Sequence, residues 1–274
     1  MEMNIFRRGK KKKEDIFWPK WHFRPIIQRS EKNVDPGEAQ FFREVGPVGA
    51  VVREAIQNSI DAAKNSERGN PPIKFSFSIN SNGGAMGPEK YMRYIEGLYP
   101  HLETLEETKR RLPKKGEKMD YLVVEDFGTH GLRGDVKLFS HDGSEEGTSV
   151  QNNDFYYFHR NINRTTSKHK RGGSFGYGKQ AFASASRINS FLTVSKVAEN
   201  PGVHDAGYRA FGSCVFKGHH IQSHRYAPYG DWGLLDQEDE SDHAVVPNES
   251  DELAEKMIQD FGLKRDQGTG LSVI

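Results

Sequence analysis

The spacing of hydrophobic and polar positions changes along the chain between a helical period and an alternating one. Residues 37–66 predict a long helix, with a break near Gly46-Pro47. Residues 87–111 predict a second helix, because apolar side chains recur there three or four positions apart. Residues 74–79 alternate as in a half-exposed strand, and the apolar run at 119–125 predicts a buried one.

The second half of the chain adds strands and one long polar segment. Residues 191–197 and 208–216 predict a pair of strands, and residues 268–274 the start of another. The polar, glycine-rich stretch 132–171 predicts a mobile lid, which the aromatic residues 155–158 anchor on the core. Because helices and strands do not alternate strictly, we expect an α+β domain in which a layer of helices covers a mixed, mostly antiparallel sheet.

Composition restricts the class of protein. Of the 274 residues, 28% are charged and 35% apolar, and no apolar run approaches the roughly 18 residues of a membrane span. We therefore expect a cytoplasmic protein without membrane contact. The single cysteine, Cys214, excludes an internal disulfide, and its apolar surroundings predict a buried structural thiol. His219, His220 and His224 lack further ligands at metal-binding spacing, so we expect loop or surface histidines.

Net charge is +1, so the whole chain has no electrostatic drive toward nucleic acid. Residues 1–36 nevertheless form a basic and aromatic arm, with six basic residues and no acid between Arg7 and Lys13. A solubilising tail is the favoured interpretation, and DNA contact through the arm is the alternative. Residues 37–274 are then the main domain.

A helix face with three polar side chains lies within residues 53–62. Glu54, Asn58 and Asp61 are spaced i, i+4 and i+7, on one face of the predicted helix. Their neighbours are small or apolar, and burying unpaired carboxylates there is costly. A metal ion and a water explain the stripe, because magnesium takes hard oxygen ligands such as an amide oxygen and Glu54 can polarise an attacking water. A surface helix with scattered polar residues is the alternative.

The apolar run at 119–125 leads into Asp126, which can accept a hydrogen bond from an exocyclic amine such as adenine N6. Gly128 and Gly131 let the backbone approach a flat ring closely. An ordinary junction between a strand and a turn explains the same residues. A protein kinase does not, because neither its glycine-rich loop nor a His-Arg-Asp loop precedes them.

A glycine-rich loop precedes a helical pattern near residue 180. Residues 172–178 contain four glycines, and the amides of such a loop can cradle phosphates, with Lys179 adding a positive charge. A P-loop is excluded, because Gln180 stands where the magnesium-binding Ser or Thr is required and no strand precedes the loop.

Taken in this order, the three motifs resemble the GHKL ATPases, which include gyrase, the large heat-shock chaperones, MutL, MORC proteins and histidine kinases. The resemblance spans residues 40–200 and is closest to the chaperone, gyrase, MutL and MORC branch and to uncharacterised bacterial chaperone-like ATPases. It implies the Bergerat ATP-binding fold, a two-layer sandwich. The histidine-kinase branch is disfavoured, because no helical phospho-acceptor domain precedes the first motif.

The resemblance also implies roles for single residues. Glu54 is the expected general base, Asn58 the magnesium ligand and Asp126 the residue that reads adenine. The family's second motif usually has one residue between its glycines, whereas Thr129 and His130 stand here, which leaves the role of Gly131 open. The residues expected to contact the nucleotide are Asn58, Asp61, Asp126, Gly128, Gly131, Gly172, Gly173, Ser174, Phe175, Gly176, Tyr177, Gly178 and Lys179.

The implied function is a magnesium-dependent ATPase in which ATP binding closes the lid and drives homodimerisation as a conformational switch. The strand that begins at residues 268–274 suggests the N-terminal part of a longer protein. In the gyrase and MutL branch a following domain supplies a further lysine, so we expect slow hydrolysis by this chain. Two alternatives are kept: a regulatory module that senses ATP without hydrolysing it, and a nucleic-acid-binding protein with an accessory ATP site.

Overall fold

A computed structural model gives the structure of most of the chain. It describes residues 17–28, 30–31, 47–64, 72–109, 111–114, 116–138, 153–161, 180–198, 207–236, 244–265 and 268–274.

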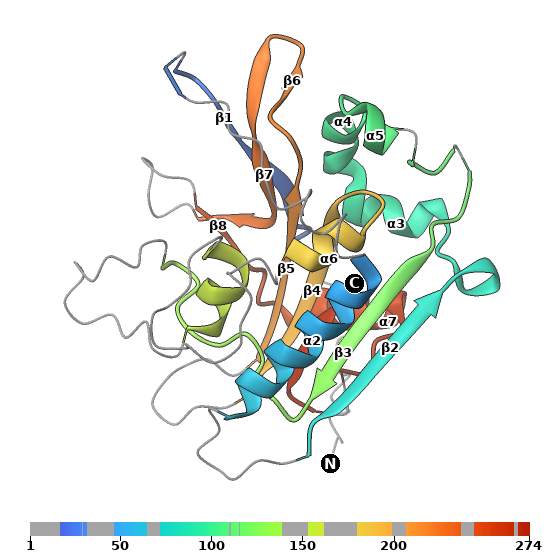
Figure 1. Ribbon diagram of the computed structural model, residues 1–274, viewed down its shortest axis with the longest axis vertical. Coiled ribbons are helices and arrows are strands. Elements are labelled where there is room, and N and C mark those ends of the chain that lie inside the picture. The colour runs from blue at the N-terminus through green and yellow to red at the C-terminus, as the bar shows by residue number, and fades with distance from the viewer. Residues whose placement is uncertain are drawn as a thin grey trace, which may run out of the picture.

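The centre of the molecule is one large open sheet (Figure 1). Its main strands follow the order β1-β7-β5-β4-β9-β3-β2, with β6 and β8 each paired to β7, and every pairing between described strands is antiparallel. The antiparallel α+β expectation is confirmed. The strands are β1 (Lys20–Pro25), β2 (Lys74–Asn80), β3 (Tyr121–Phe127), β4 (Ser190–Val197), β5 (Gly207–Val215), β6 (His219–Ile221), β7 (His224–Leu235), β8 (Val245–Val246) and β9 (Gly270–Val273).

Helices cover both faces of this sheet. Neighbouring β3 residues Val123 and Val124 point to opposite faces, and each belongs to a separate hydrophobic core. One core contains α2 and α6, the other α3 and α7, and Figure 1 shows α2 in front of the sheet with α7 behind it. The single helical layer expected from the sequence is thus replaced by two. The helices are α2 (Pro47–Lys64), α3 (Pro88–Ile95), η2 (Glu96–Leu98), α4 (Tyr99–Leu102), α5 (Glu106–Lys109), α6 (Gln180–Ala185) and α7 (Asp251–Phe261), with a 3-10 turn η1 (Asn82–Gly84).

Several predicted elements are confirmed. The alternating run at 74–79 is β2, and the predicted strand pair is β4 with β5. The strand expected at 268–274 is β9, which pairs with β3 on one side and β4 on the other. The buried strand predicted at 119–125 is β3, two residues further on, so Asp126 lies within the strand.

The long helix predicted at 87–111 is wrong. The structure divides this segment into α3, η2, α4 and α5. Gly97 lies within η2 and Pro100 near the start of α4, where a proline is tolerated because its missing N–H has no helical partner to lose. The apolar stripe is correct in spite of these breaks, since Tyr94, Leu98 and Leu102 are all buried.

Among the described elements, strands β1, β6, β7 and β8 and helix α7 had no counterpart in the sequence predictions. Within the predicted arm, residues 20–25 form β1, and Trp21 is buried with its indole N–H donating to the carbonyl of Tyr94 at 2.7 Å. The arm is therefore joined to the domain at this point. Helix α7 has ordinary end signals: the Ser250 side chain accepts from the Leu253 N–H, and Gly262 ends the helix in the left-handed conformation.

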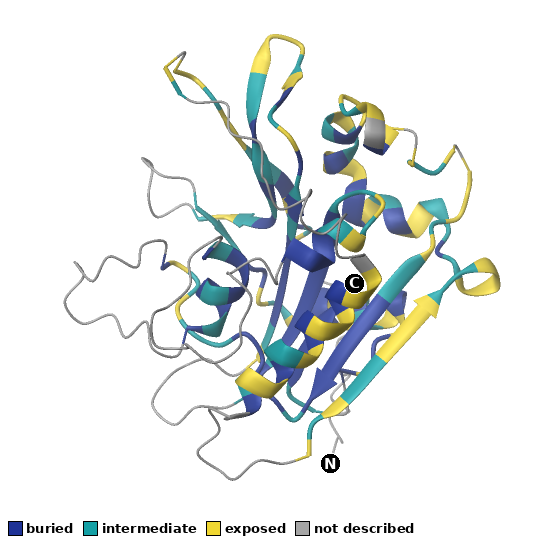
Figure 2. Ribbon diagram, in the orientation of Figure 1, coloured by how far each residue is buried: buried dark blue, intermediate teal, exposed yellow. Residues whose placement is uncertain are grey.

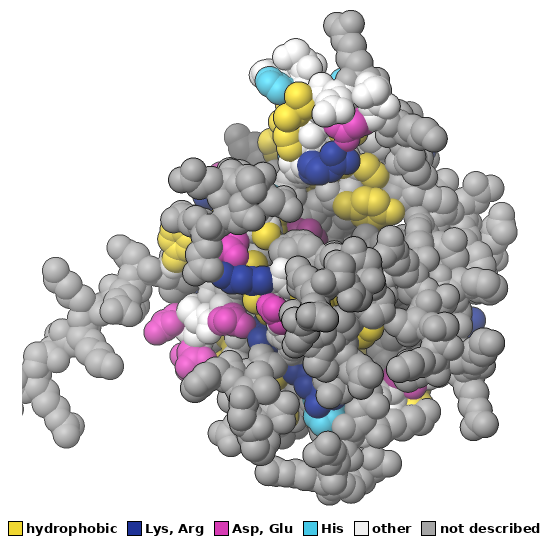
Figure 3. Space-filling view, turned by 90° about the vertical axis from the view of Figure 1, so that its left-hand side faces the viewer, with side chains coloured by type: hydrophobic (Ala, Val, Ile, Leu, Met, Phe, Trp, Pro, Cys, Tyr) yellow, Lys and Arg dark blue, Asp and Glu magenta, His cyan; other side chains and the backbone are white. Residues whose placement is uncertain are grey.

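Aromatic residues of the predicted lid are buried in the core, whereas residues 139–152 and 162–171 of that stretch lie outside the described residues. Phe155 precedes the π-helix η4 (Tyr156–Arg160) and Phe158 lies within it, and both are buried in the core that also contains α6. The same side of the molecule shows acidic and basic side chains close together (Figure 3). Ion pairs join Arg133 to Asp154 at 2.9 Å and Arg209 to Glu249 at 2.9 Å.

Cys214 and His219 lie inside the fold. Burial raises the pKa of the Cys214 thiol, in line with a structural role. The surface or loop position expected for His219 is wrong: it is buried in β6 and hydrogen-bonds His101, with 2.7 Å between the ring nitrogens. Burial and the neighbouring His219 lower the pKa of His101 to about 4. No helix in the described part of the chain is long and apolar enough to cross a membrane.

Candidate functional site

The three polar residues of the first motif lie on helix α2, and their exposure increases along the helix. Glu54 is 6% exposed, Asn58 is half-buried and Asp61 is exposed. The Arg53 guanidinium lies 3.5 Å from the Glu54 carboxylate, and the Gln57 amide donates to Asp61 at 2.9 Å. The shared face predicted for the three residues agrees with a continuous helix from Pro47 to Lys64. Glu54 lies at the buried end of this polar face.

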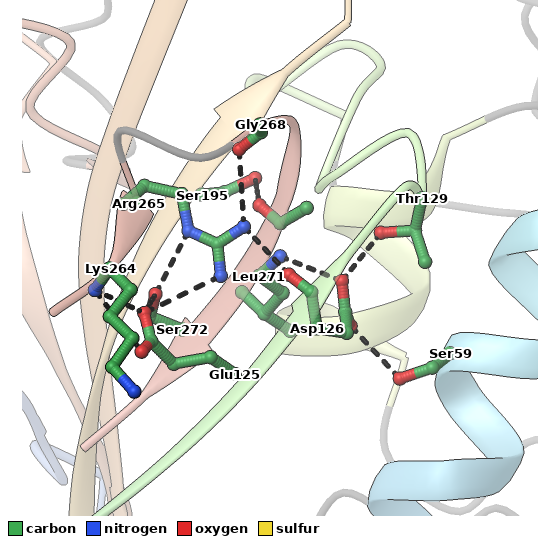
Figure 4. Close-up of polar contacts among 11 residues, drawn as sticks. Ser59, Glu125, Asp126, Thr129, Ser195, Lys264, Arg265, Gly268, Leu271 and Ser272 are labelled. Atoms are coloured by element: carbon green, nitrogen blue, oxygen red, sulfur yellow. Dashed lines mark hydrogen bonds and ion pairs between the residues drawn. The ribbon is translucent and has the colours of Figure 1, made fainter. Parts of the chain in front are cut away.

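Asp126 is held where β3, β9 and α2 meet (Figure 4). One carboxylate oxygen, Oδ1, accepts the Thr129 hydroxyl at 2.6 Å and the Leu271 N–H at 3.0 Å. The other, Oδ2, lies 3.0 Å from the Ser59 hydroxyl of α2. A carboxylate oxygen has two lone pairs, so Oδ2 retains capacity for one more donor. The side chain is 8% exposed, and its orientation is set by three elements.

The loop after β3 is hydrogen-bonded to the residues at the start of β9. Gly128 has φ +88° and donates its N–H to the carbonyl of Thr269 at 3.1 Å. The Thr269 hydroxyl in turn donates to the carbonyl of Thr129 at 2.7 Å. A side chain at Gly270 would collide with the Asp126 carbonyl and carboxylate, so a glycine is needed for this close approach. Thr269 therefore lies beside Asp126, the residue predicted to contact adenine.

Close packing against β4 explains why residue 131 is a glycine. Its φ is +70°, and a Cβ there would lie 2.6 Å from the Ser195 hydroxyl and 2.7 Å from the Lys196 carbonyl, both on β4. The Ser195 hydroxyl also accepts the N–H of Leu132 at 2.7 Å. These contacts fasten the loop to β4.

A buried charged network lies beside Asp126 (Figure 4). Arg265 is fully buried, donates to the backbone carbonyl of Asp126 at 2.7 Å and to the Ser272 hydroxyl at 3.0 Å, and stacks over Phe127 at 4.5 Å. Its guanidinium lies 3.8 Å from the Glu125 carboxylate. Burial lowers the pKa of Arg265, and the two neighbouring carboxylates oppose that shift. The network fixes the end of β3 against β9.

Two amide side chains, one on α2 and one on α6, have buried atoms without a hydrogen-bond partner in the part of the chain that the structure describes. The Asn58 Nδ2 atom and both amide atoms of Gln180 are buried without a partner. Helices α2 and α6 pack against each other through Ala50, Val51 and Ala181 in a common core. Native proteins leave few buried polar atoms unpaired, and each one needs an explanation such as a bound ligand or water.

The third motif, residues 172–179, lies outside the described residues. Of the other predicted site residues, the structure brings Asp126, Gly128 and Gly131 to one end of the sheet, with Asn58 on the helix above. Sequence reasoning missed Ser59, Thr269 and Arg265. Ser59 is part of the first motif and was available as a signal, whereas no local pattern distinguishes Arg265.

A comparison of the chain with protein families, with curated proteins and with solved structures finds no match.

Proposed function

We propose that this protein binds ATP with magnesium and hydrolyses it slowly, using the nucleotide to switch conformation. The observation that carries the proposal is Asp126: a buried carboxylate whose position is set from three sides and whose Oδ2 atom can accept one further donor. An exocyclic amine of a purine is such a donor. The supporting contacts from Ser59 link this position directly to the helix that carries Glu54 and Asn58.

In this proposal Asn58 would hold a magnesium ion that is bound to the nucleotide. No group of three or more His, Cys, Asp or Glu in the described residues can hold a metal ion. Nucleotide-bound magnesium needs no such cage, because it keeps waters and takes most other ligands from phosphates. Asn58 would contribute its amide oxygen, and its unpaired Nδ2 would donate to a phosphate or water. The ion would neutralise phosphate charge during attack by water.

Glu54 has the role of general base in this proposal. Its carboxylate is buried in the α2 helix one turn from Asn58, where a hydrogen bond to a water would orient the water and accept its proton. The neighbouring Arg53 is exposed and can move as the site fills.

Replacing Glu54 by glutamine should lower the rate of ATP hydrolysis at least about a hundredfold, because general-base catalysis contributes that much or more. ATP affinity should change little, since the amide preserves the volume. Phosphate release and calorimetric binding measure the two effects. Glu255→Gln, an exposed carboxylate on α7, is the matched control. Equal hydrolysis by both variants would contradict the role of Glu54, and binding without hydrolysis by the wild type would favour the ATP-sensing alternative.

Replacing Gln180 by methionine should stabilise the nucleotide-free protein and weaken ATP binding about tenfold. The substitution removes two buried atoms that have no partner, and each such group costs about 1–3 kcal/mol. Thermal unfolding with and without ATP measures both effects. Gln259→Met, an exposed glutamine on α7, is the control. A stabilised variant with wild-type ATP affinity would show that the amide is a packing defect and not a ligand contact.

The direct test of the proposal is calorimetric titration of the wild-type chain with ATP, with and without magnesium. Binding that tightens with magnesium supports it. Failure of Asn58→Ala to change the magnesium dependence would remove Asn58 from the metal site. A folded wild-type protein that binds no nucleotide would refute the proposal.

A further inference from the structure

The two edges of the sheet differ in how well they are protected. Strand β1, at one edge, contains Pro25 and a register shift between Phe23 and Pro25, features that discourage further pairing. Strand β2, at the other edge, runs in unbroken register with β3 from Lys74 to Asn80 and pairs with no other described strand. Its only charged residue is Lys74, at the end. Among the described residues, no strand covers the outer edge of β2.

An apolar surface lies next to this outer edge. Phe77 and Ile79 of β2 are 41% and 78% exposed. Their register partners on β3 are Val124 and Leu122, which face the α2 side of the sheet, so the two β2 side chains face that side too.

Helix α2 borders the same surface. Val52, Ile56 and Ile60 are spaced four residues apart and are 37–42% exposed. They lie next to Ser59 on the helix surface, and Ser59 contacts Asp126 of β3. Figure 2 shows exposed positions along both α2 and β2. We call this surface the β2 shelf: Val52, Ile56, Ile60, Phe77 and Ile79.

We propose that the β2 shelf is a dimer interface, in which β2 pairs antiparallel with β2 of a second copy to give one sheet across two protomers. The strand is suited to pairing with itself. A two-fold axis at Phe77 places Phe77 opposite its own copy and Phe75 opposite the partner's Ile79, so that every apolar residue meets an apolar one. Lys74 then faces the partner's Asn80, and no like charges meet.

The same axis is perpendicular to the sheet, because directly opposed residues of an antiparallel pair point to one face. Both copies of α2 therefore lie on the same side, and their exposed Val52, Ile56 and Ile60 side chains border the joined strands. The pairing uses no residue of the nucleotide site, so it is expected without ATP. A dimer that forms only with ATP would point to a different surface.

Cysteine cross-linking tests the register. Phe77→Cys should form an intermolecular disulfide, since opposed Cα atoms are about 4.5–5.5 Å apart in antiparallel pairs and disulfides span that range. Ser76→Cys alone should form no such disulfide, because Ser76 faces the partner's Ser78. The double variant Ser76→Cys with Ser78→Cys should form one. The native Cys214 is buried and does not compete. Equal cross-linking of all variants, or of none, would refute the register.

Charge insertion tests the interface itself. Ile79→Lys should raise the dimer dissociation constant at least about tenfold, because each dimer contains the change twice in an apolar contact. Ile27→Lys is the matched control, since Ile27 is 83% exposed and lies beyond the opposite edge strand. Analytical ultracentrifugation of the nucleotide-free protein measures both. A wild-type monomer throughout the micromolar range would overturn the proposal, as would a dimer that Ile79→Lys leaves unchanged.

Discussion

Replacing Asp126 by asparagine is expected to lower the affinity for ATP about a hundredfold while the protein stays folded. A hydrogen bond that involves a charged group contributes about 1.5–3 kcal/mol, and the change replaces the proposed acceptor for the adenine amine by a donor of the same size. The fold should tolerate it. The asparagine oxygen can still accept from Thr129 and Leu271, and the Ser59 hydroxyl can turn its proton to the Ala55 carbonyl, 2.9 Å away.

Base specificity separates this ligand role from a structural one. With a donor at position 126, a purine that carries a 6-keto oxygen becomes the better partner. Asp126→Asn should therefore reduce the preference for ATP over inosine triphosphate, measured by calorimetry with both nucleotides. Circular dichroism and thermal unfolding serve as controls for the fold. A folded variant with wild-type affinity and preference would show that Asp126 only joins β3 to β9 and α2.

Replacing Arg265 by methionine is expected to have the largest effect on stability. The guanidinium is fully buried and bonded to Asp126 and Ser272, and its loss leaves the buried Glu125 carboxylate without its cation. Removing one partner of a buried ion pair costs about 3–5 kcal/mol. In a protein of this size that corresponds to a fall in melting temperature of about 10 °C. Thermal and urea unfolding measure it.

A double variant identifies the cause of that loss. Adding Glu125→Gln to Arg265→Met removes the uncompensated charge, so part of the stability should return, whereas two independent losses would add. Arg24→Met is the control, because the Arg24–Glu31 ion pair is largely exposed and such pairs contribute about 0–1 kcal/mol. A single Arg265→Met variant as stable as this control would contradict the supporting role of the network.

The sequence predicted the parts of the candidate site that depend on local periodicity. The spacing of Glu54, Asn58 and Asp61 follows from 3.6 residues per turn, and the strand that ends near Asp126 follows from a continuous apolar run. The broken helix at 87–111 shows the limit of such patterns. Its apolar stripe marks which residues are buried, and it does not reveal that Gly97 and Pro100 divide the backbone.

Local pattern by itself therefore determined the antiparallel α+β class, most of the strands and the polar face of α2. Only the tertiary structure decided that β9 lies between β3 and β4, which brings Thr269 and Leu271 to Asp126 across more than a hundred residues of chain. The same is true of the burial of Arg265 and of the second helical layer. The hydrophobic period indicates which positions of a helix or strand are buried. Which strands pair with each other depends on the fit of side chains far apart in sequence, and no local segment contains that information.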